Sequence, residues 1–198
     1  MHCAGVIGQV KTAAGVVQTV TNCSTSAGAT VILNTANTKT NCVAGVVSCV
    51  NNGITSCVNR AAVTLNVTAA NTGTSICRVA GVASIQRQNM TECINGGLVT
   101  ANMANSTCPL YSAGVLATNY DADSTVSSST NSGNIVVTDY AGSACAYGGV
   151  AAYNGEGATV SGDCTTTGTI TINGTVMGDN SGSTPGGEIG EDIYGDEL

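Results

Sequence analysis

The chain has 198 residues, which is enough for one domain or two small ones. Charged residues make up only 9% of it, which disfavours long helices that stay soluble through many charged side chains. Nucleic-acid binding is also disfavoured, because five Lys and Arg residues cannot neutralise many phosphates. No run of about 18 apolar residues occurs, so no transmembrane helix is expected.

Residues 1–20 form an apolar segment punctuated by glycine. Its apolar positions fit a helical stripe, but each internal Gly costs about 1 kcal/mol in a helix, and most of the apolar residues are β-branched. The choice between helix and strand stays open for residues 3–21, and also for 77–95. We interpret residues 1–20 as a candidate donor strand that adds to the open sheet edge of a neighbouring molecule.

Residues 21–178 have the pattern of a β-rich domain. Apolar and polar residues alternate at 63–68, 134–140 and 167–176, as they do in sheets with one solvated face. Further strands are predicted at 29–34, 42–50, 97–103 and 112–118. Asn-Gly pairs, the strongest short hairpin signal, begin at Asn52, Asn95, Asn154 and Asn173.

These signals predict a mainly β fold, namely a disulfide-crosslinked antiparallel sandwich or barrel with one or two short helices in the N-terminal half. Ala-Gly-Val recurs, but its irregular spacing does not predict a repeat architecture. The five copies begin at residues 4, 14, 44, 80 and 113. Residues 119–133 are expected to be a polar loop, and 179–198 an acidic Gly/Ser-rich tail.

The ten cysteines are dispersed and contain no CxxC motif, which argues against zinc ribbons and thioredoxin-type sites. Their even number predicts disulfides of unknown pairing and therefore an oxidising compartment. The candidates are Cys3, Cys23, Cys42, Cys49, Cys57, Cys77, Cys93, Cys108, Cys145 and Cys164. Five glycosylation sequons agree with an extracellular or cell-surface protein. They are centred on Asn22, Asn66, Asn89, Asn105 and Asn173.

Charge is divided between the two halves of the chain. All five Lys and Arg residues lie within the first 87 residues, and all twelve acids lie after them, which gives +5 and −12 and the net −7. This split predicts either two lobes that attract each other or a basic end that meets the acidic end of the next subunit. A heterologous contact of the second kind builds filaments.

Few residues are candidates for chemistry. The single His2 lies at the terminus, and no nucleophile elbow or phosphate-binding loop is present, so no catalytic residue is predicted. Asp121 and Asp123 have the oxygen spacing of a partial Ca²⁺ loop, which makes calcium the one candidate cofactor. The Thr ladder at 167–175 would suit an ice-binding array, but one strand is not an array.

We therefore expect a non-enzymatic extracellular structural subunit that self-assembles head to tail into a filament, sheath or surface layer. The alternative is an extracellular adhesin or lectin-like binding module, with a Ca²⁺-dependent site near residues 119–133. A secreted enzyme of unrecognised type is a third reading.

Overall fold

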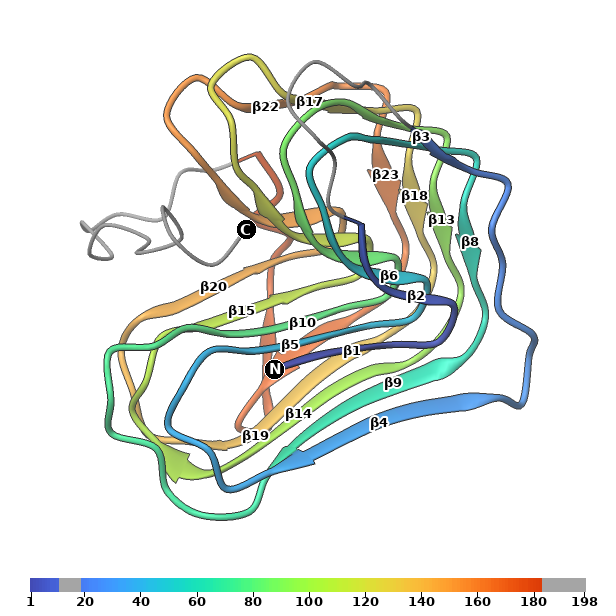
Figure 1. Cartoon of the computed structure of the whole chain (residues 1–198). Helices are drawn as coiled ribbons and strands as arrows, with labels where there is room; N and C mark the ends of the chain where they lie inside the picture. The colour runs from blue at the N-terminus through green and yellow to red at the C-terminus, as the bar shows by residue number, and fades with distance from the viewer. Residues whose placement is uncertain (11–18, 183–198) are drawn as a thin grey trace.

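The computed structural model describes residues 1–10 and 19–182, and every regular element in this part of the chain is a β-strand. The strands wind into a parallel β-solenoid of about four turns, each turn lying on the one before (Figure 1). The predicted antiparallel sandwich or barrel is therefore wrong, and so are the short helices. Residues 77–95 are strands and turns, as are the described parts of 3–21.

Successive turns contribute strands to five sheets, which we call A to E in the order in which the chain visits them. Sheet A contains β1 (His2–Ala4), β5 (Asn41–Ala44), β10 (Cys77–Ala80), β15 (Leu110–Ala113) and β20 (Cys145–Gly148). Sheet B contains β2 (Ile7–Val10), β6 (Val47–Val50), β11 (Ala83–Gln86), β16 (Leu116–Asn119) and β21 (Ala151–Asn154).

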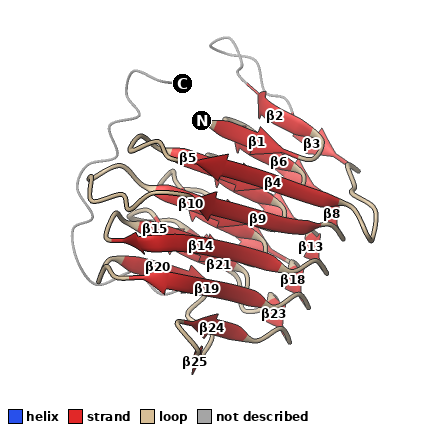
Figure 2. Ribbon diagram, turned by 90° about the horizontal axis from the view of Figure 1, so that it is seen from below, coloured by secondary structure: helices blue, strands red, loops and turns tan. Residues whose placement is uncertain are grey.

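The remaining three sheets complete each turn. Sheet C contains β3 (Thr19–Thr21), β7 (Gly53–Thr55), β12 (Met90–Thr91), β17 (Thr125–Ser127) and β22 (Thr159–Val160). Sheet D contains β8 (Val58–Asn59), β13 (Ile94–Asn95), β18 (Thr130–Asn131) and β23 (Thr165–Thr166). Sheet E contains β4 (Thr30–Thr35), β9 (Ala62–Val67), β14 (Val99–Ser106), β19 (Ile135–Tyr140), β24 (Ile170–Ile172) and β25 (Thr175–Met177). Figure 2 shows these strands stacked in order along the solenoid.

The recurrent Ala-Gly-Val is the corner between sheets A and B. In the copies at 4–6, 44–46, 80–82 and 113–115, the alanine is the last residue of a sheet A strand. The copy at 14–16 lies outside the described residues. The corner amides bond from turn to turn, with Gly45 N donating to Gly81 O at 2.8 Å and Gly81 N to Gly114 O at 2.9 Å. The recurrence is thus a structural repeat, whose spacing is irregular because the loops differ in length.

The corner divides the interior into two cores. One core lies between sheets A and E and includes Val43, Val79 and Leu65; the other lies between sheets B and C and includes Val47, Ile54 and Met90. The outer faces of sheets A and B also pack on each other, where the rings of Tyr111 and Tyr153 stack at 5.0 Å.

Packing on both faces explains the sequence of these two sheets. Each residue of β5, β6, β10 and β11 is buried. Parallel strands covered on both faces read as nearly continuous apolar runs, which is the pattern of residues 42–50. The strand predicted over 42–50 is therefore two strands joined at Gly45, and the one predicted over 112–118 is likewise two, joined at Gly114.

A buried asparagine ladder joins the turns at the end of sheet D. Nδ2 of Asn59 donates to Oδ1 of Asn95, and Nδ2 of Asn95 donates to Oδ1 of Asn131, each at 2.8 Å between residues 36 positions apart. The three side chains are fully buried. Thr25 donates to Asn59 at the first turn, and Thr166 accepts from Asn131 at the last. In-register stacking of identical amides satisfies polar groups that would otherwise be costly to bury.

One predicted hairpin is confirmed. β24 and β25 pair antiparallel across Asn173 and Gly174, whose φ angles are 49° and 82°. The Asn-Gly pairs that begin at Asn52, Asn95 and Asn154 instead lie where the chain turns toward its next sheet. Residues 119–133 are not one loop, because they contain β17 and β18.

The predicted disulfide crosslinks are not present, because no two cysteines lie at bonding distance. The sulfurs of Cys77 and Cys108, for example, lie 3.7 Å apart. Eight of the cysteines fill positions in or against the two cores, and Cys42 and Cys49 pack with Ile85 in a separate cluster. Hydrogen bonds between parallel strands, rather than disulfides, join the turns.

Candidate functional site: the outer face of sheet E and the two ends

The outer face of sheet E is a regular array of uncharged side chains, which we call the Thr–Asn face. Its strands alternate between buried and outward residues, as expected for a sheet with one solvated side. The face is made of Thr30, Ile32, Asn34, Ala62, Thr64, Asn66, Thr100, Asn102, Val136, Thr138 and Thr171. None of these residues carries a charge.

The outward residues form rows along the solenoid axis because the register is the same from strand to strand. Asn34, Asn66 and Asn102 pair in one row, which Thr138 continues. Their side chains are joined by hydrogen bonds, with Asn66 donating to Asn34 at 2.8 Å and Asn102 to Asn66 at 2.6 Å. Neighbouring strands of a sheet are about 4.8 Å apart, so the row presents amide and hydroxyl groups at that interval.

The row beside it contains Ile32, Thr64, Thr100, Val136 and Thr171. Two residues along a strand span about 6.6 Å, so the two rows form a two-dimensional lattice of hydroxyl, amide and methyl groups. The single Thr ladder expected at 167–175 is therefore divided: Thr171 belongs to this array, whereas Thr175 lies on β25 beyond the turn.

The N-terminal end of the solenoid presents strand edges. β1, β2, β3 and β4 each lie at the edge of their sheet, and each has a recorded partner on one side only within the described residues. Val6 at this end is 47% exposed and Ile32 is 49% exposed. Among residues 1–10 and 19–182, the exposed Lys and Arg residues nearest this end are Lys39 and Arg60, in the first two turns.

The C-terminal end presents the edges of β20, β21, β22 and β23. In sheet E, β25 covers the edge of β24. Residues 178–182 return to the corner between sheets A and B. There Oδ1 of Asp179 accepts from Gly149 N at 2.7 Å, and Oγ of Ser181 accepts from Val150 N at 2.8 Å. Exposed acids, among them Glu156 and Asp163, lie in this last turn.

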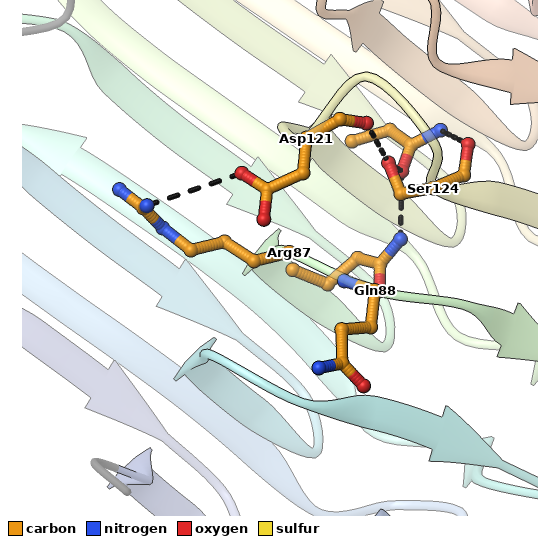
Figure 3. A network of polar contacts seen from close by, with 6 residues as sticks. Arg87, Gln88, Asp121 and Ser124 are labelled. Carbon is orange, nitrogen blue, oxygen red and sulfur yellow. Dashed lines mark hydrogen bonds and ion pairs between the residues drawn. The ribbon is translucent and has the colours of Figure 1, made fainter. Parts of the chain in front are cut away.

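The candidate calcium loop is the turn between β16 and β17. Asp121 and Asp123 are both exposed there, and Asp121 pairs with Arg87 at 3.9 Å (Figure 3). Partial burial raises the pKa of the Asp121 carboxyl, and the Arg87 guanidinium opposes that rise. Ser124 holds the turn by donating to the backbone oxygen of Asp121 and to Oδ1 of Asn119 at 2.6 Å. Within residues 1–10 and 19–182, no three His, Cys, Asp or Glu side chains gather in a way that could hold a metal.

Four cysteines occupy matching positions in the core between sheets B and C: Cys23, Cys57, Cys93 and Cys164. A hydrogen bond between the thiols of Cys57 and Cys93 lowers the pKa of Cys57 to about 7 and raises the pKa of Cys93. Both side chains are fully buried, so this pair is closed to solvent.

The sequons are distributed unevenly. Asn22, Asn89 and Asn105 are exposed, whereas Asn66 lies in a hydrogen-bonded row of the Thr–Asn face. Asn173 is bonded to the backbone of Tyr140, donating to its oxygen at 2.6 Å. His2 is half-buried against Ser48, with 3.2 Å between Nδ1 and Oγ.

Comparison with known proteins gives no relative, since no family model, curated protein or solved structure matches the chain. Among the described residues, none forms a helix long and apolar enough to cross a membrane. Sequence reasoning missed the Thr–Asn face and the asparagine ladder. The 36-residue spacing of Asn59, Asn95 and Asn131 was the signal that could have revealed both.

Proposed function

We propose that the protein is a non-enzymatic structural subunit that associates end to end with copies of itself, outside the cell or at its surface. The observation that carries this proposal is the order of charge along the solenoid axis. A solenoid advances along its axis one turn at a time, so residues that are early in the sequence lie at one end and late residues at the other.

The charge split of the sequence is therefore a polarity of the folded molecule. Exposed Lys39 and Arg60 belong to the first two turns, and Glu156, Asp163 and Asp179 belong to the last turn or follow it. Arg78 does not contribute to the surface because it is fully buried. Lys11 and the five acids after residue 187 lie outside the described residues.

Two copies in the same orientation bring the acidic end of one to the basic end of the other. Opposed charges steer and orient such a contact, and a head-to-tail contact that does not close on itself extends into a filament. Strand edges at both ends add backbone hydrogen bonds to that contact. The proposal of an external location now draws on the sequons at exposed Asn22 and Asn105, because the disulfide argument no longer supports it.

The test is association of the purified chain as a function of salt, followed by sedimentation and electron microscopy. Screening lengths fall from about 30 Å at 0.01 M to about 3 Å at 1 M, so association should be strong at low salt and weak at high salt. Replacing Lys39 and Arg60 with Gln should weaken it. The matched control changes charge by the same amount in the middle of the solenoid, with Gln88→Glu and Thr107→Glu at two exposed positions. A chain that stays monomeric at every salt concentration would contradict the proposal.

The Thr–Asn face favours a second candidate, a binding module for an uncharged solid with a regular surface. The feature that favours this candidate is the regular register of the face, which repeats amide, hydroxyl and methyl groups from strand to strand. Co-sedimentation with insoluble polysaccharide and partition into ice would test it. Thr100→Lys should abolish such binding, whereas Thr91→Lys, on sheet C, should leave it unchanged.

A further inference from the structure

We infer that β25 and residues 178–182 partly cover the surface on which the N-terminal turn of a second copy stacks. For the full contact to form, β25 must leave sheet E. The inference rests on the proposed end-to-end association and names its two surfaces. The partner is a second copy of this chain, because its basic end complements the acidic end that β25 occupies.

The two ends match strand for strand in three sheets. At the C-terminal end, β20, β21 and β22 have their recorded partners on one side only, and at the N-terminal end the same is true of β1, β2 and β3. A second copy in the same orientation can continue sheets A, B and C by placing β1 on β20, β2 on β21 and β3 on β22. Each of these pairings is parallel, like those inside the molecule.

Sheet E breaks this match. The strand that would receive β4 of the second copy is β24, and its edge is taken by β25 in antiparallel pairing. All sheets of a solenoid advance together by one strand per turn, so one extra strand in a single sheet makes a step in an otherwise level end. The second copy must either tilt over this step or displace β25.

β25 has few attachments to hold it. It has three residues, paired as Ile170 with Met177, Thr171 with Val176 and Ile172 with Thr175. Val176 is 71% exposed, and only Met177 packs against the core between sheets A and E. The following segment is tied down by the two bonds from Asp179 and Ser181 to the amides of Gly149 and Val150. Those two amides lie at the corner where a second copy's Gly5 and Val6 would follow β1.

The opposite charges of the two ends also support stacking of a second copy on the C-terminal end. Asp179 lies in the covering segment itself, and Asp163 and Glu156 are exposed in the last turn. In the part of the chain that the structure describes, Lys39 and Arg60 are the exposed Lys and Arg residues nearest the opposite end. Stacking would therefore exchange the Asp179 contact within one molecule for contacts between oppositely charged ends of two molecules.

The experiment uses the full chain and compares Thr175→Pro with Thr175→Val. In an antiparallel hairpin with a two-residue turn, the pair next to the turn is hydrogen-bonded, so proline at 175 removes a donor that faces β24, whereas valine keeps a β-branched strand residue. Assembly at low salt is followed by light scattering, and the fold is checked by circular dichroism. Thr175→Pro should assemble about tenfold faster than the Val variant, a factor that corresponds to about 1.4 kcal/mol.

A second variant guards against misfolding. Ser181→Ala removes the bond to Val150 without touching a strand, and it should also assemble faster than the unaltered chain. In assembled wild-type material, hydrogen exchange should be fast at residues 175–177 and slow at 170–172. Equal assembly rates for all variants, or protection of 175–177 in the polymer, would overturn the role of β25 while leaving end-to-end association intact. If neither the unaltered chain nor any variant associates, the proposed function itself fails.

Discussion

Gly81 and Asn95 meet inside the same turn of the solenoid, at the point where the corner between sheets A and B approaches the end of sheet D. A Cβ atom built on Gly81 would overlap Oδ1 of Asn95 and the backbone oxygen of Gly114. Gly45 and Asn59 stand in the same relation one turn earlier. The corner glycine and the ladder asparagine thus form a single repeated contact, which separates the two cores.

Asn95→Ala should destabilise the protein by about 3 kcal/mol, because the change leaves several buried polar groups of the ladder without a partner. Those groups include one of the two N–H groups on Nδ2 of Asn59, whose other N–H donates to Ala61, and the backbone oxygen of Gly97. Urea unfolding measures the effect. Asn102→Ala on the outer face should cost less than about 1 kcal/mol, since water can replace its partners. Similar losses at the two sites would contradict the assignment of the inner ladder as the stabilising one.

Gly81→Ala should destabilise the protein by about 3 kcal/mol or more, because the methyl group would meet backbone and a buried amide that cannot move aside. Gly8→Ala is the matched control, since no atom lies within 4 Å of a Cβ built at Gly8, a strand position. Thermal melts of the two variants give the comparison. If Gly81→Ala melts at the same temperature as Gly8→Ala, the close contact between Gly81 and Asn95 is not needed for stability.

Asp163 should make stability depend on pH in the acid range. Its carboxylate accepts from Ser128 N at 3.0 Å and from Ser128 Oγ at 2.7 Å, and these bonds lower its pKa to about 2. A lowered pKa in the folded state contributes stability that is present above the unfolded value of about 3.9 and is lost as the pH falls through about 2. Asp163→Ala should therefore melt below wild type at pH 6, with the gap closing by pH 2. Asp123→Ala, at another exposed aspartate, serves as the control.

All ten cysteines should titrate as free thiols once the purified chain is unfolded without reductant. In the native state, alkylation should reach the four half-buried thiols first. These are Cys3, Cys23, Cys145 and Cys164. The other six lie in the interior and should react at the rate of unfolding or local opening. Mass spectrometry after alkylation counts the modified sites, and a count below ten in denaturant would mean that crosslinks exist after all.

Strands with one solvated face were the part of the fold that the sequence made visible. The ranges predicted at 29–34, 63–68 and 134–140 correspond to β4, β9 and β19, because all three lie in sheet E, where polar residues face water. Residues 42–50 were read as one strand, since burial on both faces removes the alternation that would mark the corner at Gly45. The short strands of sheets C and D were missed for a different reason: two or three residues carry too little periodicity to be recognised.

The candidate site was largely invisible for the same reason. Thr64 and Thr100 are 36 residues apart and look unrelated until the register places them side by side. The alternation at 167–176, around Thr171, indicated one solvent-facing strand, and only the stacking of strands places Thr171 in a row of the lattice. The separation of basic and acidic residues was visible in the sequence. Its placement at opposite ends of the molecule followed only from the solenoid topology, which the sequence had not predicted.

The amino-acid sequence by itself determined that this protein is built of strands, carries little charge and keeps its bases and acids in separate halves. Those properties follow from composition and short-range pattern, so they do not depend on how the strands are arranged. Only the tertiary structure decided that the strands run parallel, that the cysteines form no disulfides and that the charge split becomes two ends. Such features depend on contacts between residues about one turn apart, and a period of roughly 36 residues with loops of unequal length leaves no short-range trace.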